Sequence, residues 1–177
     1  MRIVGGRLRG RRLRVPPGVR PTTERLREAL FAIVEVNRLR VLDLFAGSGA
    51  LGIEALSRGA ESALLLERDR EACNVIRANL ALARPWARGS LRGGDVWKEL
   101  PRIEQRFHLV FADPPYGAHT LDGIHEATRA LIESGDLLVL EHRFDLPPPP
   151  CPEGWSRLTV RRYGASAIVI DSPSTGD

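Results

Sequence analysis

The segment 41–52 constrains the fold of this chain more than any other. Its first five residues are apolar except for Asp43, as in a strand buried inside a parallel sheet. Glycines follow at positions 47, 49 and 52 in a G-x-G-x-x-G pattern, and apolar residues with helical spacing begin at Leu51. Glycine permits positive φ and lets a ligand approach the main chain, so this strand, turn and helix start predict a nucleotide-binding socket.

Acidic residues near this socket indicate what it binds. Asp43 lies inside the strand, where a carboxylate is costly without a polar partner. Glu67 closes the next apolar run about 20 residues after Gly47, the spacing at which an acidic residue binds ribose hydroxyls in dinucleotide-binding folds. Asp95 follows the third strand region and suits either an adenine amino group or a helix N-cap. We therefore expect an adenosine-containing cofactor, either a nicotinamide dinucleotide or S-adenosylmethionine.

From residue 40 onward, strand-like and helix-like segments alternate. We expect strands at 40–45, 62–67, 88–93, 107–112 and 136–141, and helices at 50–59, 69–83, 96–103 and 120–134. Each connection is long enough for a crossover helix, so the sheet should be parallel and doubly wound. Runs at 155–163 and 165–171 predict an antiparallel hairpin at the sheet edge, for seven strands in all. We expect residues 40–177 to form this α/β domain and residues 1–39 to form an N-terminal arm and helix.

The N-terminal arm is strongly basic. Residues 1–40 contain eleven arginines and three glutamates, a net charge of +8 in a chain of 177 residues whose total is +4. Arginines alternate with Leu8, Leu13 and Val15, which favours a small two-stranded arm packed on the rest of the chain. Thr22 or Thr23 can cap the following helix. A basic arm on a mildly acidic body indicates an anionic polymer as partner, although Lys98 is the only lysine and arginine serves as the general cation.

A second constellation, Asp113-Pro-Pro-Tyr116, follows the apolar run 109–112. In an open α/β sheet, ligands bind at the carboxyl ends of the strands, so this tetrapeptide should face the same crevice as the glycines. Two prolines fix the backbone and remove two N–H donors, which leaves acceptors: the Asp113 carboxylate and nearby carbonyls. Tyr116 adds a flat face for stacking. Acceptors that hold both N–H bonds of an aromatic amine can aim its lone pair at an electrophilic methyl group, so this motif favours amine methylation.

Other functional classes have little support. Cys73 and Cys151 are too few for a disulfide framework or a metal cluster, and no apolar run approaches the ~20 residues of a membrane helix. The basic N-terminus lacks the apolar core of a signal peptide. We expect a cytoplasmic, metal-free protein that does not enter a membrane.

With these residues in hand, the chain resembles the class I S-adenosylmethionine-dependent methyltransferases, which have a Rossmann-like fold. More narrowly, it resembles the RsmD family of bacterial 16S ribosomal RNA (guanine-N2) methyltransferases. The resemblance covers nearly the whole chain and rests on the opening at 2–11, the Arg20-Pro-Thr-Thr helix start, the segment 43–59 and Asp113-Pro-Pro-Tyr116. It implies methylation of the exocyclic N2 of a guanine, at position 966 in the usual numbering. It further implies the 30S ribosomal subunit as partner, and we expect a monomer.

The resemblance also implies residue roles. Cofactor contacts would come from Asp43, Phe45, Gly47, Gly49, Glu67 and Asp95. The target base would be held by Asp113, Pro114, Pro115 and Tyr116. RNA phosphates would be bound by Arg9, Arg11, Arg12, Arg20 and Arg25. The proline run 147–150 and the tail 172–177 match no family signature, so substrate contacts there have no support.

Alternatives remain on the residues alone. The same acceptors serve adenine N6 and cytosine N4, so the Asp113 motif does not choose among these amines. A sequence-specific DNA enzyme would need a target-recognition domain, for which this chain has no room. A nicotinamide-dependent oxidoreductase fits the glycine spacing but needs a proton donor such as a paired Tyr and Lys, and Lys98 lies in a helix expected away from Tyr116. A non-catalytic RNA-binding module would not need the Asp113 motif.

Overall fold

A seven-stranded sheet forms the centre of the molecule. The computed structural model describes residues 1–18, 22–83, 87–115 and 121–174. The strands are β1 (Arg40–Leu44), β2 (Ser62–Glu67), β3 (Arg88–Gly93), β4 (Leu109–Ala112), β5 (Leu137–Arg143), β6 (Trp155–Tyr163) and β7 (Ser166–Pro173). Their order in the sheet is β3-β2-β1-β4-β5-β7-β6. Strands β1 to β5 are parallel, and β6 and β7 form an antiparallel hairpin joined to β5, which confirms the expected architecture.

The strand order places a crevice beside β1. Strand β2 follows β1 on one side, whereas β4 pairs with β1 on the other side, so the direction of winding reverses between β1 and β4. Ligands of open α/β sheets bind at such a switch point, at the carboxyl ends of the strands. The register pairs Leu44 with Ala112. The segments that follow these two residues therefore leave the sheet at the same edge.

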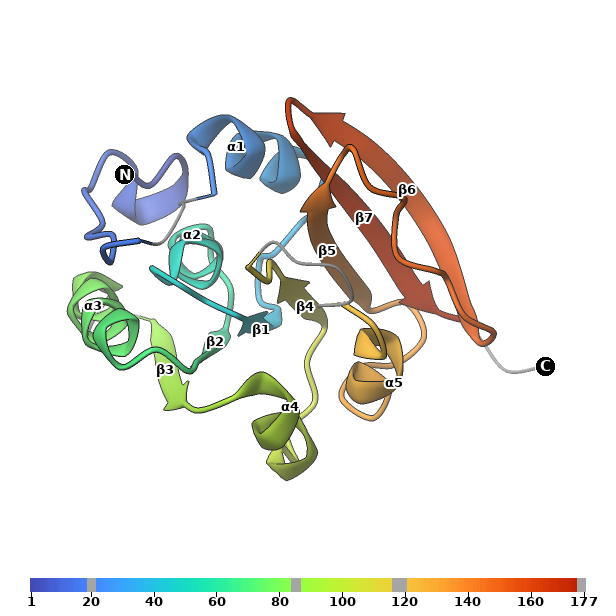
Figure 1. Cartoon of the computed structure of the whole chain (residues 1–177). Helices are drawn as coiled ribbons and strands as arrows, with labels where there is room; N and C mark the ends of the chain where they lie inside the picture. The colour runs from blue at the N-terminus through green and yellow to red at the C-terminus, as the bar shows by residue number, and fades with distance from the viewer. Residues whose placement is uncertain (19–21, 84–86, 116–120, 175–177) are drawn as a thin grey trace.

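Helices cover both faces of the sheet (Figure 1). Helices α1 (Glu24–Ile33), α2 (Ala50–Ser57) and α3 (Arg70–Leu80) lie on one face, while α4 (Val96–Glu99) and α5 (Ile124–Thr128) lie on the other. Alternate residues of β1 supply the two cores: Val41 packs with α1 to α3, and Leu42 and Leu44 pack with α4 and α5. This alternation buries both faces, as the apolar character of the strand predicts.

All four expected helices are shorter than predicted, two of them substantially. The segment 96–103 divides into α4 and a 3-10 turn at Leu100–Arg102, because Pro101 has no N–H for a continuing helix. Within the expected helix 120–134, α5 covers only Ile124–Thr128 among the described residues. The chain then turns, and the carbonyl of Leu131 accepts a hydrogen bond from the Phe107 amide at 2.8 Å. Burial of Leu131 and Ile132 thus produced a helical pattern without a helix.

The N-terminal arm packs onto α2 and α3 (Figure 1). It contains one antiparallel bridge, Arg2 to Arg12, and a 3-10 turn at Gly6–Leu8, so the expected pair of strands is reduced to a single bridge. Its apolar residues Ile3, Leu8 and Leu13 are buried in the same cluster as helices α1 to α3. The division into parts at residues 39 and 40 stays a prediction.

Candidate active site

The glycine loop connects β1 to α2 with unusual backbone angles. Phe45, Gly47 and Gly49 have φ values of 58°, 56° and 78°, in the left-handed region that favours glycine. Phe45 adopts this conformation despite its side chain, which marks a constrained position at the mouth of the crevice. A Cβ on Gly52 would lie 3.0 Å from Leu65 Cγ and 3.1 Å from Asp43 Oδ2. Gly52 therefore lets helix α2 approach the strand that bears Asp43.

Asp43 is a buried carboxyl group beneath this loop. Only 2% of the residue is exposed, and its Oδ2 accepts a hydrogen bond from the Gly52 amide at 2.8 Å. The pKa of Asp43 is raised from 3.8 to about 7, mainly by burial and also by the nearby Glu67 charge, while the Gly52 bond acts in the opposite direction. The side chain lines the cavity described below. A cationic ligand group at this point would favour the ionised form of Asp43.

Glu67 and Asp95 end the neighbouring strand regions. Glu67 accepts hydrogen bonds from the amides of Gly47, at 2.7 Å, and Asp69, at 2.8 Å, so it fastens the glycine loop to the end of β2. Asp95 caps α4 by accepting from the Trp97 amide at 3.1 Å. This confirms the cap expected for Asp95, while its contact with an adenine stays a prediction. Both carboxylates line the same cavity.

The Asp113-Pro-Pro turn begins directly after β4. The Asp113 carboxyl accepts a hydrogen bond from the Thr22 hydroxyl at 2.7 Å and shares a hydrogen bond with the side chain of Glu141, on the adjacent strand β5. Burial raises the pKa of Asp113 well above its usual range, and the Glu141 charge raises it further; the Thr22 bond acts in the opposite direction. Asp113 is therefore a buried carboxyl group that shares a hydrogen bond with Glu141, while its Oδ2 accepts one from Thr22.

One cavity of about 710 Å³ brings these groups together. Of the residues expected to bind cofactor or base, its lining includes Asp43, Phe45, Gly47, Glu67, Asp95, Asp113, Pro114 and Pro115. Gly49 lies in the loop but does not line the cavity; a Cβ there would lie 2.9 Å from Leu65 Cδ2, so the loop has no room for a side chain at this position. Tyr116 and Arg20 lie outside the described residues.

The lining also includes residues that sequence reasoning did not single out. Thr22 was considered only as a helix cap, but Thr23 is the cap of α1 and the hydroxyl of Thr22 bonds Asp113 instead. Glu141 and Trp97 had no motif to mark them. Glu141 ends the apolar run of β5 near the carboxyl end of the strand, and Asp43 interrupts that of β1; a carboxylate at such a position was the available signal.

The arginines of the arm and of helix α1 differ in their exposure to solvent. Arg9, Arg11 and Arg12 are exposed on the arm, and Arg25 is exposed at the start of α1, as RNA-binding residues would need to be. Arg27 is fully buried, with no exposed surface. Arg27 therefore neither lies on a solvated face nor is accessible to RNA phosphates. The guanidinium pairs with the carboxylate of Glu54 at 3.8 Å.

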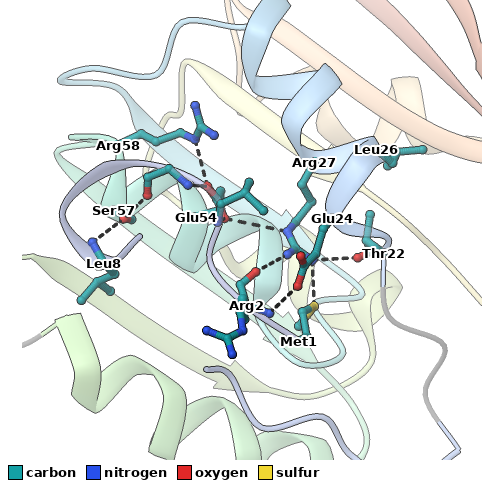
Figure 2. Close-up of polar contacts among 12 residues, drawn as sticks. Met1, Arg2, Leu8, Thr22, Glu24, Leu26, Arg27, Glu54, Ser57 and Arg58 are labelled. Carbon is teal, nitrogen blue, oxygen red and sulfur yellow. Dashed lines mark hydrogen bonds and ion pairs between the residues drawn. The ribbon is translucent and has the colours of Figure 1, made fainter. Parts of the chain in front are cut away.

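Glu54 fastens the arm to the body (Figure 2). This buried side chain on α2 accepts hydrogen bonds from the amides of Val4, at 2.9 Å, and Gly5, at 2.7 Å. One turn later, Ser57 accepts from the Leu8 amide and donates to the Gly5 carbonyl. A carboxylate inside the otherwise apolar helix 50–57 was the sequence signal for this anchor.

Neither a membrane-spanning helix nor a metal-binding cluster occurs in the described part of the chain. None of its helices has the length and apolarity needed to cross a lipid bilayer. Nor do three or more His, Cys, Asp or Glu side chains within those ranges gather as a metal site would require.

Known proteins match nearly the whole chain. The family model described as "Conserved hypothetical protein 95" matches residues 1–171. Ribosomal RNA small subunit methyltransferase D of Escherichia coli (strain K12) is 40% identical over 169 residues, which cover 88% of this chain and 81% of that protein. The protein of the same name from Haemophilus influenzae is 34% identical over 180 residues, covering 93% and 89%. The solved structure named "Putative methyltransferase yhhF from Escherichia coli" superposes with a TM-score of 0.85 at 35% identity, covering 98% of this chain and 97% of that one.

Proposed function

Because this chain belongs to the family of Ribosomal RNA small subunit methyltransferase D, we propose that it transfers a methyl group from S-adenosylmethionine to N2 of a guanine in 16S rRNA. We propose guanine 966 as the target, within the 30S subunit. The enzyme then works in the cytoplasm, where ribosomal subunits assemble, and acts as a monomer without a metal ion.

The observation that carries this proposal is the meeting of two turns in one cavity. The glycine loop after β1 and the Asp113-Pro-Pro turn after β4 both line it, together with carboxylates from β1 and β2. Its volume of about 710 Å³ lies in the upper part of the roughly 300–1,000 Å³ range of ligand pockets, which favours a site for a cofactor together with a flipped base.

The lining fits the proposed cofactor by its chemistry. S-adenosylmethionine, when bound, supplies an electrophilic methyl group and carries an ammonium, two ribose hydroxyls and an adenine amine. We assign Asp43, Phe45, Gly47 and Gly49 to the methionine portion, Gly49 through the loop backbone. Glu67 would accept from the ribose hydroxyls, and Asp95 from the adenine amine. Each carboxylate oxygen can accept more than one hydrogen bond, so the main-chain bonds of Glu67 and Asp95 do not exclude these contacts.

The Asp113 turn would act on the guanine. The lone pair of the exocyclic amine is delocalised into the ring, so the amine is a poor nucleophile until its N–H bonds are held. Asp113 and the Pro114 carbonyl would each accept a hydrogen bond from one of the two amine N–H groups. The rigid Pro115 would fix the turn, and Tyr116 would stack on the base. On transfer, the bond from the cofactor sulfur to the methyl group would be replaced by the bond to N2, and one amine proton would pass to the ionised carboxylate of the Asp113–Glu141 pair.

The exposed arm would bind the RNA. Arg9, Arg11 and Arg12, with Arg20 and Arg25 near the start of α1, would contact phosphates and orient the base toward the cavity. Gly18, Thr22 and Thr23 line the cavity, so the arm and α1 reach its rim.

The test is methyl transfer from labelled S-adenosylmethionine to 30S subunits that lack the modification, followed by digestion to nucleosides. Labelled N2-methylguanosine is the expected product, and loss of the label from subunits with guanine 966 replaced would locate it. Label on adenosine or cytidine would retain the fold and cofactor but refute guanine as the substrate.

A further inference from the structure

The side chain of Thr22 connects the N-terminal part of the chain to Asp113. Its hydroxyl donates to Asp113 Oδ2 at 2.7 Å, and both residues line the cavity. The next residue, Thr23, uses its own hydroxyl to cap α1 through the Leu26 amide. The two adjacent threonines therefore have separate tasks, and only the hydroxyl of Thr23 is needed for the helix.

Arg27 holds Thr22 in place. Its guanidinium donates to the Thr22 carbonyl at 2.7 Å and also contacts Met1 Sδ and the Arg2 carbonyl (Figure 2). A buried cation is costly unless it is paired, and burial lowers the pKa of Arg27 while Glu54 opposes that change. The buried guanidinium group of Arg27 thus holds Met1 and Arg2 of the arm together with Thr22, the residue that bonds Asp113.

The Thr22 hydroxyl changes the state of Asp113 as well as its orientation. A donated hydrogen bond stabilises a carboxylate relative to the neutral acid, so Thr22 lowers the pKa of Asp113 against the opposing effects of burial and Glu141. Removal of the hydroxyl should raise that pKa further. It also frees the carboxyl group to rotate away from the position that would receive the amine.

We propose that Thr22 is a positioning residue for Asp113 and that Arg27, anchored on Glu54, holds Thr22 in the position from which it acts. The inference rests on the proposed function, since the task of Asp113 is to accept the guanine amine. It adds a connection between the anchor of the arm and the group that would orient the base.

The first test compares Thr22→Val, which removes the hydroxyl at nearly constant shape, with Thr22→Ser, which retains it. Thr22→Val should lower kcat about tenfold or more, with little change in KM for 30S subunits. Its kcat should reach its plateau at higher pH than in wild type, and Thr22→Ser should restore both properties. Thr128→Val is the control, because it also removes a threonine hydroxyl, but one that is buried and bonds the carbonyls of α5. A wild-type pH profile in Thr22→Val would overturn the inference.

A second readout does not depend on activity. The carboxyl carbon of Asp113 can be titrated by NMR in the ligand-free chain, and Thr22→Val should move its midpoint to higher pH. An unchanged midpoint would overturn the inference even if methylation were confirmed. If the midpoint moves but wild type forms no N2-methylguanosine, the proposed function fails, and with it the catalytic task given to Thr22.

Arg27 is tested by Arg27→Lys, which keeps the charge opposite Glu54 but loses the planar fork. Arg58→Lys is its control, because Arg58 also contacts Glu54, at 3.0 Å, but is not bonded to Thr22. Arg27→Lys should lower kcat, and the double variant with Thr22→Val should lose no more than Thr22→Val alone, since both act through one contact. If the kcat losses of the two single variants multiply in the double variant, Arg27 does not act through Thr22. If Arg27→Lys does not fold, the Thr22 pair still decides the proposal.

Discussion

Replacement of Asp43 by Asn should remove a loss of stability that the ligand-free wild-type protein undergoes as pH rises, while it weakens cofactor binding. The folded chain retains the Asp43 proton up to a pKa of about 7, whereas the unfolded chain releases it at the ordinary value of 3.8. The contribution of Asp43 to stability is therefore complete below the unfolded pKa and is lost as pH rises toward the folded pKa. Asn has no proton to lose and should abolish this dependence.

The size of the effect follows from the two pKa values. A difference of about three pKa units corresponds to about 4 kcal/mol once pH exceeds both. About half of that is already lost by about pH 5.5, so between about pH 5.5 and about pH 8 the wild-type chain should lose a further 2 kcal/mol or so relative to Asp43→Asn. Any constant cost of the Asn amide cancels in this comparison.

Urea unfolding of both chains at the two pH values measures the difference. Asp145→Asn is the control: Asp145 is exposed and its pKa is lowered by Arg143, so that variant should show no pH-dependent difference from wild type in this range. Calorimetry with S-adenosylhomocysteine should show weaker binding for Asp43→Asn. A stability difference that stays constant from about pH 5.5 to about pH 8 would show that the burial of Asp43 has been misread.

Three further results are expected. Asp113→Ala should abolish methyl transfer but leave the calorimetric affinity for S-adenosylhomocysteine nearly unchanged, because the carboxyl group faces the base. Gly6→Ala should loosen the arm and lower the stability of the protein by more than the ~1–2 kcal/mol that a non-glycine residue loses in the left-handed conformation. The added Cβ would lie 1.9 Å from the Ser57 carbonyl oxygen, and amide hydrogen exchange in the arm measures the effect. Removal of three arm charges should weaken RNA binding and reduce its salt slope by about two to three units, measured by filter binding at several salt concentrations. These charges belong to Arg9, Arg11 and Arg12.

Each of the three has an outcome that contradicts it. A large loss of cofactor affinity in Asp113→Ala would place Asp113 in the cofactor site. Gly10→Ala is the control for Gly6→Ala: Gly10 also has a positive φ, of 81°, but its added Cβ meets nothing within 4 Å. Equal losses of stability in the two variants would mean that the close contact of Gly6 with Ser57 of α2 is unimportant. An unchanged salt slope would make the arm arginines structural.

The sheet was predictable because its strands are marked by local sequence. The run at 41–45 is apolar on both faces of the strand, and the glycines that follow define the turn, so β1 and the start of α2 could be read directly. The same logic failed for 120–134, where buried residues have helical spacing but the Leu131 carbonyl bonds the Phe107 amide. Apolar periodicity reports burial, and only the partner of each main-chain group decides whether a helix continues.

The cavity was predictable in part for a related reason. Asp43, Glu67 and Asp113 each end or interrupt an apolar run, Asp95 follows the third strand, and parallel strands bring such positions to one edge. Neither Thr22 nor Arg27 lies at the end of an apolar run, so the sequence did not indicate that they belong to the site. Their roles depend on contacts with residues 91 and 27 positions away, Asp113 and Glu54, and sequence spacing within a helix does not disclose partners on other elements.

The anchoring of the arm has a consequence for the order of folding during synthesis. The Leu8 amide bonds Ser57, which is made 49 residues later. At ordinary translation rates this interval lasts about 2 to 10 s. The arm is therefore synthesised first but acquires its place only after α2 has formed. Truncated nascent chains that end before Glu54 should have a protease-sensitive N-terminus, and longer chains that expose α2 beyond the ribosome should become protected.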